Sequence, residues 1–146
     1  MKTPHILIVN GPNLNLLGTR QPEIYGTMTL EAIIDDVRAD FDDIVIDEFQ
    51  SNHEGALIDC LQGAASHGVD GIVLNAGGYT HTSVALADAV AAISIPVVEV
   101  HLSNIYAREP ERRRSLLSPV CRGTITGLGH HVYFHGVYAL LYMIER

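Results

Sequence analysis

A loop near the start of the chain carries an arginine and a tyrosine five residues apart, Arg20 and Tyr25. A free tyrosine has a pKa of about 10 and is a poor base at neutral pH, but a neighbouring guanidinium, which is always charged, favours the phenolate. The pair could therefore remove a proton from a substrate. The spacing alone leaves a second interpretation open, in which a solvated arginine and a tyrosine simply pack the loop.

A second pair, Glu99 and His101, lies two residues apart in an otherwise apolar run. Side chains at this spacing leave the same face of a strand. A carboxylate beside an imidazole favours the protonated ring and fixes its orientation, which suits a general acid. The alternative is a core histidine whose hydrogen bonds are satisfied by its neighbours.

The elements that must position these pairs follow from the apolar pattern. Apolar or alternating runs predict strands at 6–9, 44–49, 71–75, 96–102 and 123–127. Helical spacing predicts helices at 29–41, 56–67, 83–93 and 128–144. Strands separated by such helices pair in parallel through right-handed crossovers. We therefore predict an α/β fold, a three-layer, flavodoxin-like, doubly wound sheet of five parallel strands in one catalytic domain over residues 1–146.

Parallel strands end at one edge of the sheet, where open α/β sheets bind ligands. The loops there carry a set of polar side chains: Asn13, Arg20, Tyr25, Asn75, His81, His101, Ser103 and Arg112. Residues 18–27, punctuated by glycine and proline, are predicted to form a lid over this edge. The backbone N–H groups of Leu102 and Ser103 could receive an anion, and Arg112 could clamp a carboxylate.

The predicted helix at 83–93 is apolar nearly all round and rich in alanine, with Asp88 as its single charge. Such a helix is buried on more than one side, and small residues permit close approach of another surface. We expect a subunit interface with Asp88 paired across it. The alternative is that Asp88 lies at a solvent-facing notch.

Composition excludes several classes of function. The only lysine is Lys2, so a Schiff base on an internal lysine and a P-loop lysine both lack a residue. A net charge of −8 argues against a nucleic-acid partner. No apolar segment could span a bilayer and no signal-peptide run follows the first residues, so we expect a cytoplasmic protein without a membrane partner.

Cysteine and histidine offer two further kinds of candidate site. Cys60 and Cys121 belong to no Cys-x-x-Cys pair, so we expect reduced thiols. His131 and His135 are one helical turn apart beside His130, but no third ligand at a suitable spacing accompanies them, so we predict no metal site.

The whole chain, from about residue 5 to the last helix, resembles type II 3-dehydroquinate dehydratase. The resemblance rests on blocks in the right order: Asn10-Gly-Pro-Asn-Leu-Asn-Leu-Leu-Gly-Thr-Arg20 with Tyr25-Gly26, Gln50-Ser-Asn52 with Glu54-Gly55, Asn75-Ala-Gly-Gly-Tyr-Thr-His-Thr-Ser83 with Asp88, and Glu99-Val-His-Leu-Ser-Asn104 with Arg108-Glu-Pro110. Residues 111–115, Glu-Arg-Arg-Arg-Ser, depart from the stretch of many members, which starts with an aromatic residue and contains histidines.

The resemblance implies a reaction and its acid and base. It implies an anti elimination of water from 3-dehydroquinate, giving 3-dehydroshikimate through an enolate, in the shikimate or quinate pathway, without metal or cofactor. Tyr25 would be the base and Arg20 would hold it as phenolate and stabilise the transition state. Asn13 would stabilise the enolate oxygen through a bound water. His101 would protonate the departing hydroxyl, oriented by Glu99.

The resemblance also implies how substrate is bound and how subunits assemble. The residues that would bind the substrate's hydroxyls and carboxylate are Asn75, His81, Leu102, Ser103 and Arg112. Asp88 would reach into the site of a neighbouring subunit, in a homododecamer of four trimers.

Functions of other classes fit the residues less well. An FMN-binding module would need a phosphate-cradling loop rich in Ser, Thr and Gly after the first strand, where this chain has Gly11-Pro-Asn-Leu-Asn-Leu-Leu17. A phospho-receiver would need clustered aspartates after the first strands and a lysine near the last. A shell-like scaffold would account for an oligomer but not for Tyr25, Arg20 and His101 at one edge.

Overall fold

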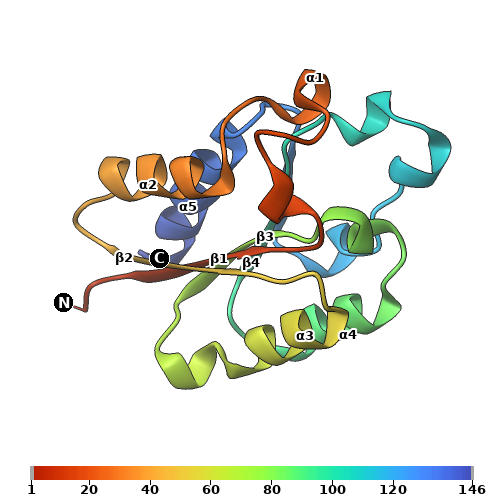
Figure 1. Cartoon of the computed structure of the whole chain (residues 1–146). Coiled ribbons are helices and arrows are strands. Elements are labelled where there is room, and N and C mark those ends of the chain that lie inside the picture. The colour runs from red at the N-terminus through yellow and green to blue at the C-terminus, as the bar shows by residue number, and fades with distance from the viewer. Residues whose placement is uncertain (1, 146) are drawn as a thin grey trace.

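The computed structural model describes residues 2–145, which form one parallel sheet with helices on both faces (Figure 1). Its strands are β1 His5–Asn10, β2 Val45–Gln50, β3 Gly71–Asn75, β4 Val97–His101 and β5 Gly123–Thr126. They lie in the order β2-β1-β3-β4-β5, and every neighbouring pair is parallel. This arrangement confirms the predicted fold class.

The helices are α1 Pro22–Tyr25, α2 Leu30–Asp40, α3 Glu54–Gly63, α4 Val84–Ala92 and α5 His131–Ile144. Helices α2 and α5 cover one face of the sheet, and α3 and α4 cover the other (Figure 1). Short 3-10 turns occupy much of the connections: η1 Leu14–Leu16, η2 Ala65–His67, η3 Gly77–His81, η4 Ile105–Ala107, η5 Pro110–Arg112 and η6 Ser118–Val120. No helix within residues 2–145 is long and apolar enough to cross a membrane.

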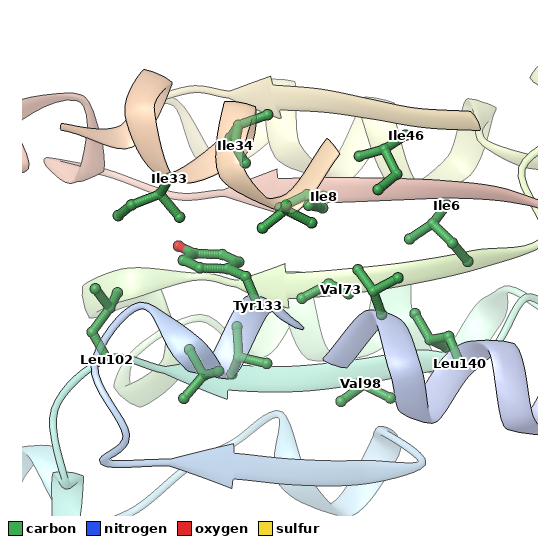
Figure 2. Packing of buried hydrophobic residues seen from close by; sticks show 14 of the residues in the cluster. Ile6, Ile8, Ile33, Ile34, Ile46, Val73, Val98, Leu102, Tyr133 and Leu140 are labelled. Carbon is green, nitrogen blue, oxygen red and sulfur yellow. The ribbon is translucent and has the colours of Figure 1, made fainter. Parts of the chain in front are cut away.

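Each face of the sheet buries its own apolar cluster, because successive strand residues point to opposite faces. On β1, Ile6 and Ile8 join the cluster under α2 and α5, whereas Leu7 and Val9 join the cluster under α3 and α4. Figure 2 shows the first cluster, in which the ring of Tyr133 lies among aliphatic side chains. Burial on both faces accounts for the apolar runs of the interior strands β1 and β3, whereas the edge strand β2 carries exposed acidic residues.

Side-chain hydroxyls cap the starts of α2 and α4. The hydroxyl of Thr29 accepts a hydrogen bond from the N–H of Ala32 at 3.1 Å, and the hydroxyl of Ser83 accepts one from the N–H of Leu86 at 2.9 Å. Each cap satisfies a backbone donor that the helix itself leaves free.

Two helices differ from their predicted bounds by more than one residue at an end. The last helix begins at His131 and not at 128, because Gly127 and Gly129 adopt the left-handed backbone with φ of 91° and 61°. The helix predicted at 56–67 is α3, which starts two residues earlier and ends at Gly63, followed by the η2 turn. The strand predicted at 96–102 is one residue shorter at each end.

The predicted lid contains one turn of helix that the sequence did not reveal. Gln21 precedes it in the left-handed region with φ of 42°, Pro22 supplies its first residue, and Gly26 follows with φ of 88° and ψ of 178°. That last conformation is nearly restricted to glycine. The turn therefore depends on its flanking residues and carries Tyr25 at its end.

Candidate active site

The carboxyl ends of β1, β3 and β4 surround a pocket with about 590 Å³ of empty space, its open mouth included. Nine of the eleven predicted site residues line it: Asn13, Arg20, Tyr25, Asn75, His81, His101, Leu102, Ser103 and Arg112. Residues from separate loops meet here because parallel strands all end at this edge. Glu99 and Asp88 are the two that do not line the pocket.

Glu99 lies directly behind His101. Its carboxylate is fully buried, and its Oε2 is 2.5 Å from Nε2 of His101, which is 5% exposed. As predicted, both side chains leave the same face of β4. An imidazole nitrogen this close to an ionised carboxylate carries the proton, so Nδ1 is the nitrogen of His101 left for the pocket.

The charge of Glu99 is stabilised by hydroxyls as well as by His101. Burial by itself raises the pKa of this carboxyl, but hydrogen bonds from His101, Ser118 and Ser115 outweigh burial and bring the pKa below its ordinary value. Glu99 is therefore ionised at neutral pH although it has no access to water. A fixed negative charge in this position holds a proton on Nε2 of His101 through the hydrogen bond between the two side chains.

His81 lies beside His101, with the two rings stacked at 6.3 Å between centroids. Nδ1 of His81 is 2.7 Å from the carbonyl oxygen of Arg114. Because a carbonyl oxygen only accepts, Nδ1 carries a proton, and Nε2 is the acceptor in the tautomer that this contact selects. His81 is thus arranged to accept a hydrogen bond from a hydroxyl in the pocket.

The side chain of Asn75 is held in place by the buried Tyr133. Its Nδ2 donates to the hydroxyl of Tyr133 at 3.0 Å, and that hydroxyl donates to Oδ1 of Asn10 at 2.5 Å. Burial raises the pKa of Tyr133, which keeps the phenol protonated and able to donate. Oδ1 of Asn75 accepts from the N–H of Gly77 at 3.3 Å. The amide at the end of β3 is therefore held in one orientation.

Asn13 stands at the start of the η1 turn in the left-handed backbone conformation, with φ of 68°. Its N–H donates to Oδ1 of Asn52 at 3.0 Å, and Gln50 donates to that same oxygen at 3.2 Å. Asparagine tolerates this backbone better than most residues. The loop after β1 is thereby tied to the loop after β2, which presents the Asn13 side chain at the pocket wall.

Tyr25 lies between two guanidinium groups. The central carbon of Arg20 is 4.9 Å from the ring centroid of Tyr25, and that of Arg108 is 5.5 Å from it. Nη1 of Arg108 also donates to the Tyr25 hydroxyl at 3.3 Å and to the hydroxyl of Ser103 at 3.1 Å. The Tyr25 ring and hydroxyl are therefore in direct contact with two positively charged side chains.

Arg108 is the site residue that the sequence interpretation missed. It lines the pocket and contacts Tyr25, although the sequence pattern gives it no role beyond its place in a block typical of the family. Four arginines lie between 108 and 114, and spacing does not reveal which of them point into the pocket. The signal available was the neighbouring Glu109-Pro110, which starts the η5 turn after Arg108 and directs the chain away.

Ser103 and Arg112 are both held by neighbours. The Ser103 carbonyl accepts from the Thr126 hydroxyl at 2.9 Å, and Nε of Arg112 is 2.7 Å from the Glu109 carboxylate. This ion pair spans one 3-10 turn and leaves Arg112 partly exposed at the pocket wall. Arg112 and Ser103 both line the pocket, and a guanidinium together with a hydroxyl is suited to a carboxylate ligand.

Asp88 lies on the exposed face of α4, away from this pocket. The other exposed residues of that helix are small or apolar: Val84, Ala85, Ala91 and Ala92. Within residues 2–145, no three His, Cys, Asp or Glu side chains are placed to hold a metal ion together.

Known proteins resemble this chain over nearly its full length. The model of the dehydroquinase class II family matches residues 4–141. A 3-dehydroquinate dehydratase from Pelodictyon phaeoclathratiforme is 53% identical over 144 residues, which are 98% of this chain and 95% of the relative. Another from Bacillus licheniformis is 58% identical over 132 residues, 89% of this chain and 90% of the relative.

The solved structures agree. The crystal structure of the type II dehydroquinase from Butyrivibrio crossotus matches with a TM-score of 0.93 and 44% identity, covering 95% of this chain and 98% of that one. The type II dehydroquinase from Propionibacterium acnes matches with a TM-score of 0.89 and 34% identity over 99% of this chain and 98% of that one. From its sequence and its fold, the chain belongs to the class II dehydroquinase family.

Proposed function

We propose that this protein is a 3-dehydroquinate dehydratase, a hydro-lyase that removes water from 3-dehydroquinate to give 3-dehydroshikimate in the shikimate or quinate pathway. The observation that carries the proposal is the pairing across one pocket of Tyr25, flanked by two guanidiniums, with His101, backed by the buried Glu99. Family membership and the names of the relatives support it.

The reaction begins with a proton transfer to Tyr25. As phenolate, Tyr25 takes the proton from the carbon beside the substrate ketone, and the bonding electrons move to the ketone oxygen to form an enolate. Arg20 holds the phenolate and stabilises the charge that develops. Asn13 stabilises the enolate oxygen through a water that it orients.

The second step breaks the carbon–oxygen bond. The enolate electrons return to form the conjugated double bond, and the hydroxyl on the neighbouring carbon leaves with a proton from Nδ1 of His101, so that water is released on the side opposite Tyr25. This is an anti elimination with general acid catalysis. Tyr25 ends protonated and His101 neutral, so a proton passes through solvent before the next turnover.

The remaining pocket residues bind the substrate. Arg112 takes the carboxylate, with Ser103 and the backbone of Leu102 beside it. Asn75 and His81 bind hydroxyls, His81 as an acceptor through Nε2. Residues 18–27 form the lid, which closes Tyr25 and Arg20 over the bound substrate. The mechanism uses no metal and no cofactor.

The assembly proposed is a homododecamer of four trimers in the cytoplasm, with no nucleic-acid or membrane partner. The small exposed face of α4 supports a subunit interface, and Asp88 is the charge that it would carry into a neighbouring site. The free thiols of Cys60 and Cys121 support a reducing compartment. Asp88→Ala should give smaller particles in light scattering with reduced activity; unchanged size and kinetics would refute the interface role.

The activity is tested by adding 3-dehydroquinate to purified protein and following the ultraviolet absorbance of the conjugated enone product. Parallel samples contain a chelator or borohydride, which would stop a metal-dependent or an imine mechanism respectively. The absorbance should rise equally in all samples. No rise in a folded, oligomeric sample would refute the proposal, and inhibition by either reagent would refute the mechanism.

A further inference from the structure

The carboxylate of Glu99 has all its acceptor sites filled. Oε2 accepts from His101 at 2.5 Å and from the hydroxyl of Ser115 at 2.7 Å. Oε1 accepts from the hydroxyl of Ser118 at 2.5 Å and from that of Thr124 at 3.1 Å. An ionised carboxylate has about four lone-pair sites, two on each oxygen, and these four donors occupy them.

The three hydroxyls reach Glu99 for separate structural reasons. Thr124 on β5 is the register partner of Glu99 on β4, so the two side chains leave neighbouring strands side by side. Ser115 and Ser118 come from the turn before β5. The hydroxyl oxygen of Ser115 accepts from the N–H groups of Leu117 and Ser118, which folds the turn so that both hydroxyls face the carboxylate.

This environment selects one protonation state. A protonated carboxyl would present an O–H donor where the partners already donate, whereas an ionised carboxylate accepts from every one of them. Each serine or threonine hydroxyl carries one proton, and donating it to Glu99 uses it. The three hydroxyls therefore disfavour protonation of Glu99 through their hydrogen bonds, in addition to the effect of His101.

We propose that Ser115, Ser118 and Thr124 are positioning residues for the acid of this site: their hydroxyls keep the charge on Glu99 and so keep the proton of this short contact on Nε2 of His101. The proposal rests on the proposed function, in which His101 protonates the leaving hydroxyl. With the hydroxyls in place, the proton between Glu99 and His101 stays on Nε2, and Nδ1 faces the pocket as the donor of the proposed mechanism. Without them, Glu99 attracts the Nε2 proton more strongly, and the ring becomes a weaker acid.

Two other titratable groups face this cluster. Burial, and then the charge of Glu99, raise the pKa of Cys121 to about 12, so this thiol remains neutral throughout a kinetic pH profile. The ring of His81 stacks on His101 from the loop after β3. Neither group is altered by a change at Ser118, which contacts only Glu99 and Thr124 through its hydroxyl.

The first test is Ser118→Ala. Loss of one hydrogen bond to a charged acceptor should lower kcat about tenfold. KM should stay within about twofold, because Ser118 does not line the pocket. The alkaline limb of kcat against pH should move to higher pH. Without the hydrogen bond from Ser118, the Glu99 carboxylate is less stabilised and binds the His101 proton more tightly. In ¹⁵N spectra, Nε2 of His101 should move toward the value of an unprotonated nitrogen.

Matched variants separate this effect from a loss of packing. Ser118→Thr keeps the hydroxyl and should restore the kcat and both pH and ¹⁵N signatures. Thr124→Val keeps the shape but loses the weaker, 3.1 Å donor, and should show the same signatures to a smaller extent. Ser66→Ala removes an exposed hydroxyl that bonds only the Gly63 carbonyl, and should change nothing.

A fall in kcat with an unmoved alkaline limb and unmoved Nε2 resonance would reduce the hydroxyls to a packing role and overturn the proposal. Unchanged kcat in the double variant Ser118→Ala and Thr124→Val would overturn it too. The ¹⁵N measurement uses free protein. If the wild-type protein does not turn over 3-dehydroquinate, the proposed function fails, while the Nε2 resonance still decides whether the hydroxyls hold the proton on His101.

Discussion

Tyr25 and His101 face the same pocket, but different kinds of structure hold them. His101 belongs to an interior strand, is almost completely buried and is backed by a carboxylate that accepts four hydrogen bonds. Tyr25 ends a single helical turn between a left-handed Gln21 and Gly26, and its hydroxyl has one long hydrogen bond, to Arg108. A second groove opens on its other side, so the tyrosine lies between two cavities.

This difference follows from what each half must do. A buried ion pair is stable only when its hydrogen-bond partners are in place. Here the sheet and the turn before β5 supply these partners together. In the proposed mechanism Tyr25 lies on a lid that opens to admit substrate, and a segment held by few contacts opens at low energetic cost. The acid half of the proposed mechanism, His101 with Glu99, is therefore part of the core, whereas the base half, Tyr25 on residues 18–27, lies on a separate loop.

The largest effect is expected for Tyr25→Phe. Loss of the proton acceptor should lower kcat by about a thousandfold or more, while substrate affinity in calorimetry and the thermal midpoint stay near wild type. Tyr106→Phe, at an exposed tyrosine, is the matched control. A Phe variant with near wild-type turnover would remove Tyr25 from the mechanism.

Glu99→Gln should damage both activity and stability. The amide places N–H donors against hydroxyl donors at a site without water, so we expect a loss of about 3 kcal/mol in the free energy of unfolding and about a hundredfold in kcat. Denaturant titration and steady-state kinetics measure the two effects.

The pH dependence of the same site has a defined sign. The pKa of Glu99 is lowered in the folded protein, so its stabilising contribution is complete above its ordinary value of 4.5 and is lost as the pH falls through the folded value. Glu99→Gln should lack this acid-side loss. If Glu99→Gln were as stable as wild type at pH 7 and lost stability over the same acid range, Glu99 would not be the stabilising buried charge that distinguishes the site of His101 from that of Tyr25.

Arg108→Gln should lower kcat about tenfold, less than either change above, because Arg20 still lies over the Tyr25 ring. Stability should not change, in contrast to Glu99→Gln. Arg122→Gln, at an exposed arginine outside the pocket, serves as control; an unchanged kcat in Arg108→Gln would remove Arg108 from the base half.

Gly26→Ala should have the smallest effect. A Cβ at this glycine meets no atom within 4 Å, so the only cost is its φ of 88°, about 1–3 kcal/mol confined to the lid. We expect kcat/KM to fall severalfold with an unchanged thermal midpoint. Gly55→Ala, also open but without a positive φ, is the control. A large drop in the thermal midpoint would mean that the lid is part of the core.

The sequence was sufficient for the acid half and for most of the fold. Apolar runs such as 71–75 predict strands, and the two-residue spacing of Glu99 and His101 is enough to place both side chains on one face of a strand. The hydroxyl donors were not predictable in this way, because Ser115, Ser118 and Thr124 reach Glu99 across 16 to 25 residues through a turn and a strand register. Such contacts depend on tertiary geometry that single-residue patterns do not contain.

The base half was predicted by residue type but not by conformation. Glycine and proline indicated a loop at 18–27, yet the helical turn at Pro22–Tyr25 depends on a left-handed Gln21, which is an uncommon backbone for glutamine. The second cation, Arg108, comes from 83 residues away. Local propensity therefore located the lid without showing what holds its tyrosine.

The order of the chain adds a consequence for synthesis on the ribosome. The interior strand β1 and the loop that carries Tyr25 are synthesised first. The hydroxyl donors to Glu99 are synthesised after Glu99 itself, and the last of them, Thr124, lies on β5. A nascent chain interrupted before Thr124 already contains Tyr25, His101 and Glu99, but it lacks β5 and the α5 helix that covers the sheet. An unfinished chain that ends before Thr124 thus has the acid and base groups of the proposed mechanism without the full set of donors that hold the charge on Glu99.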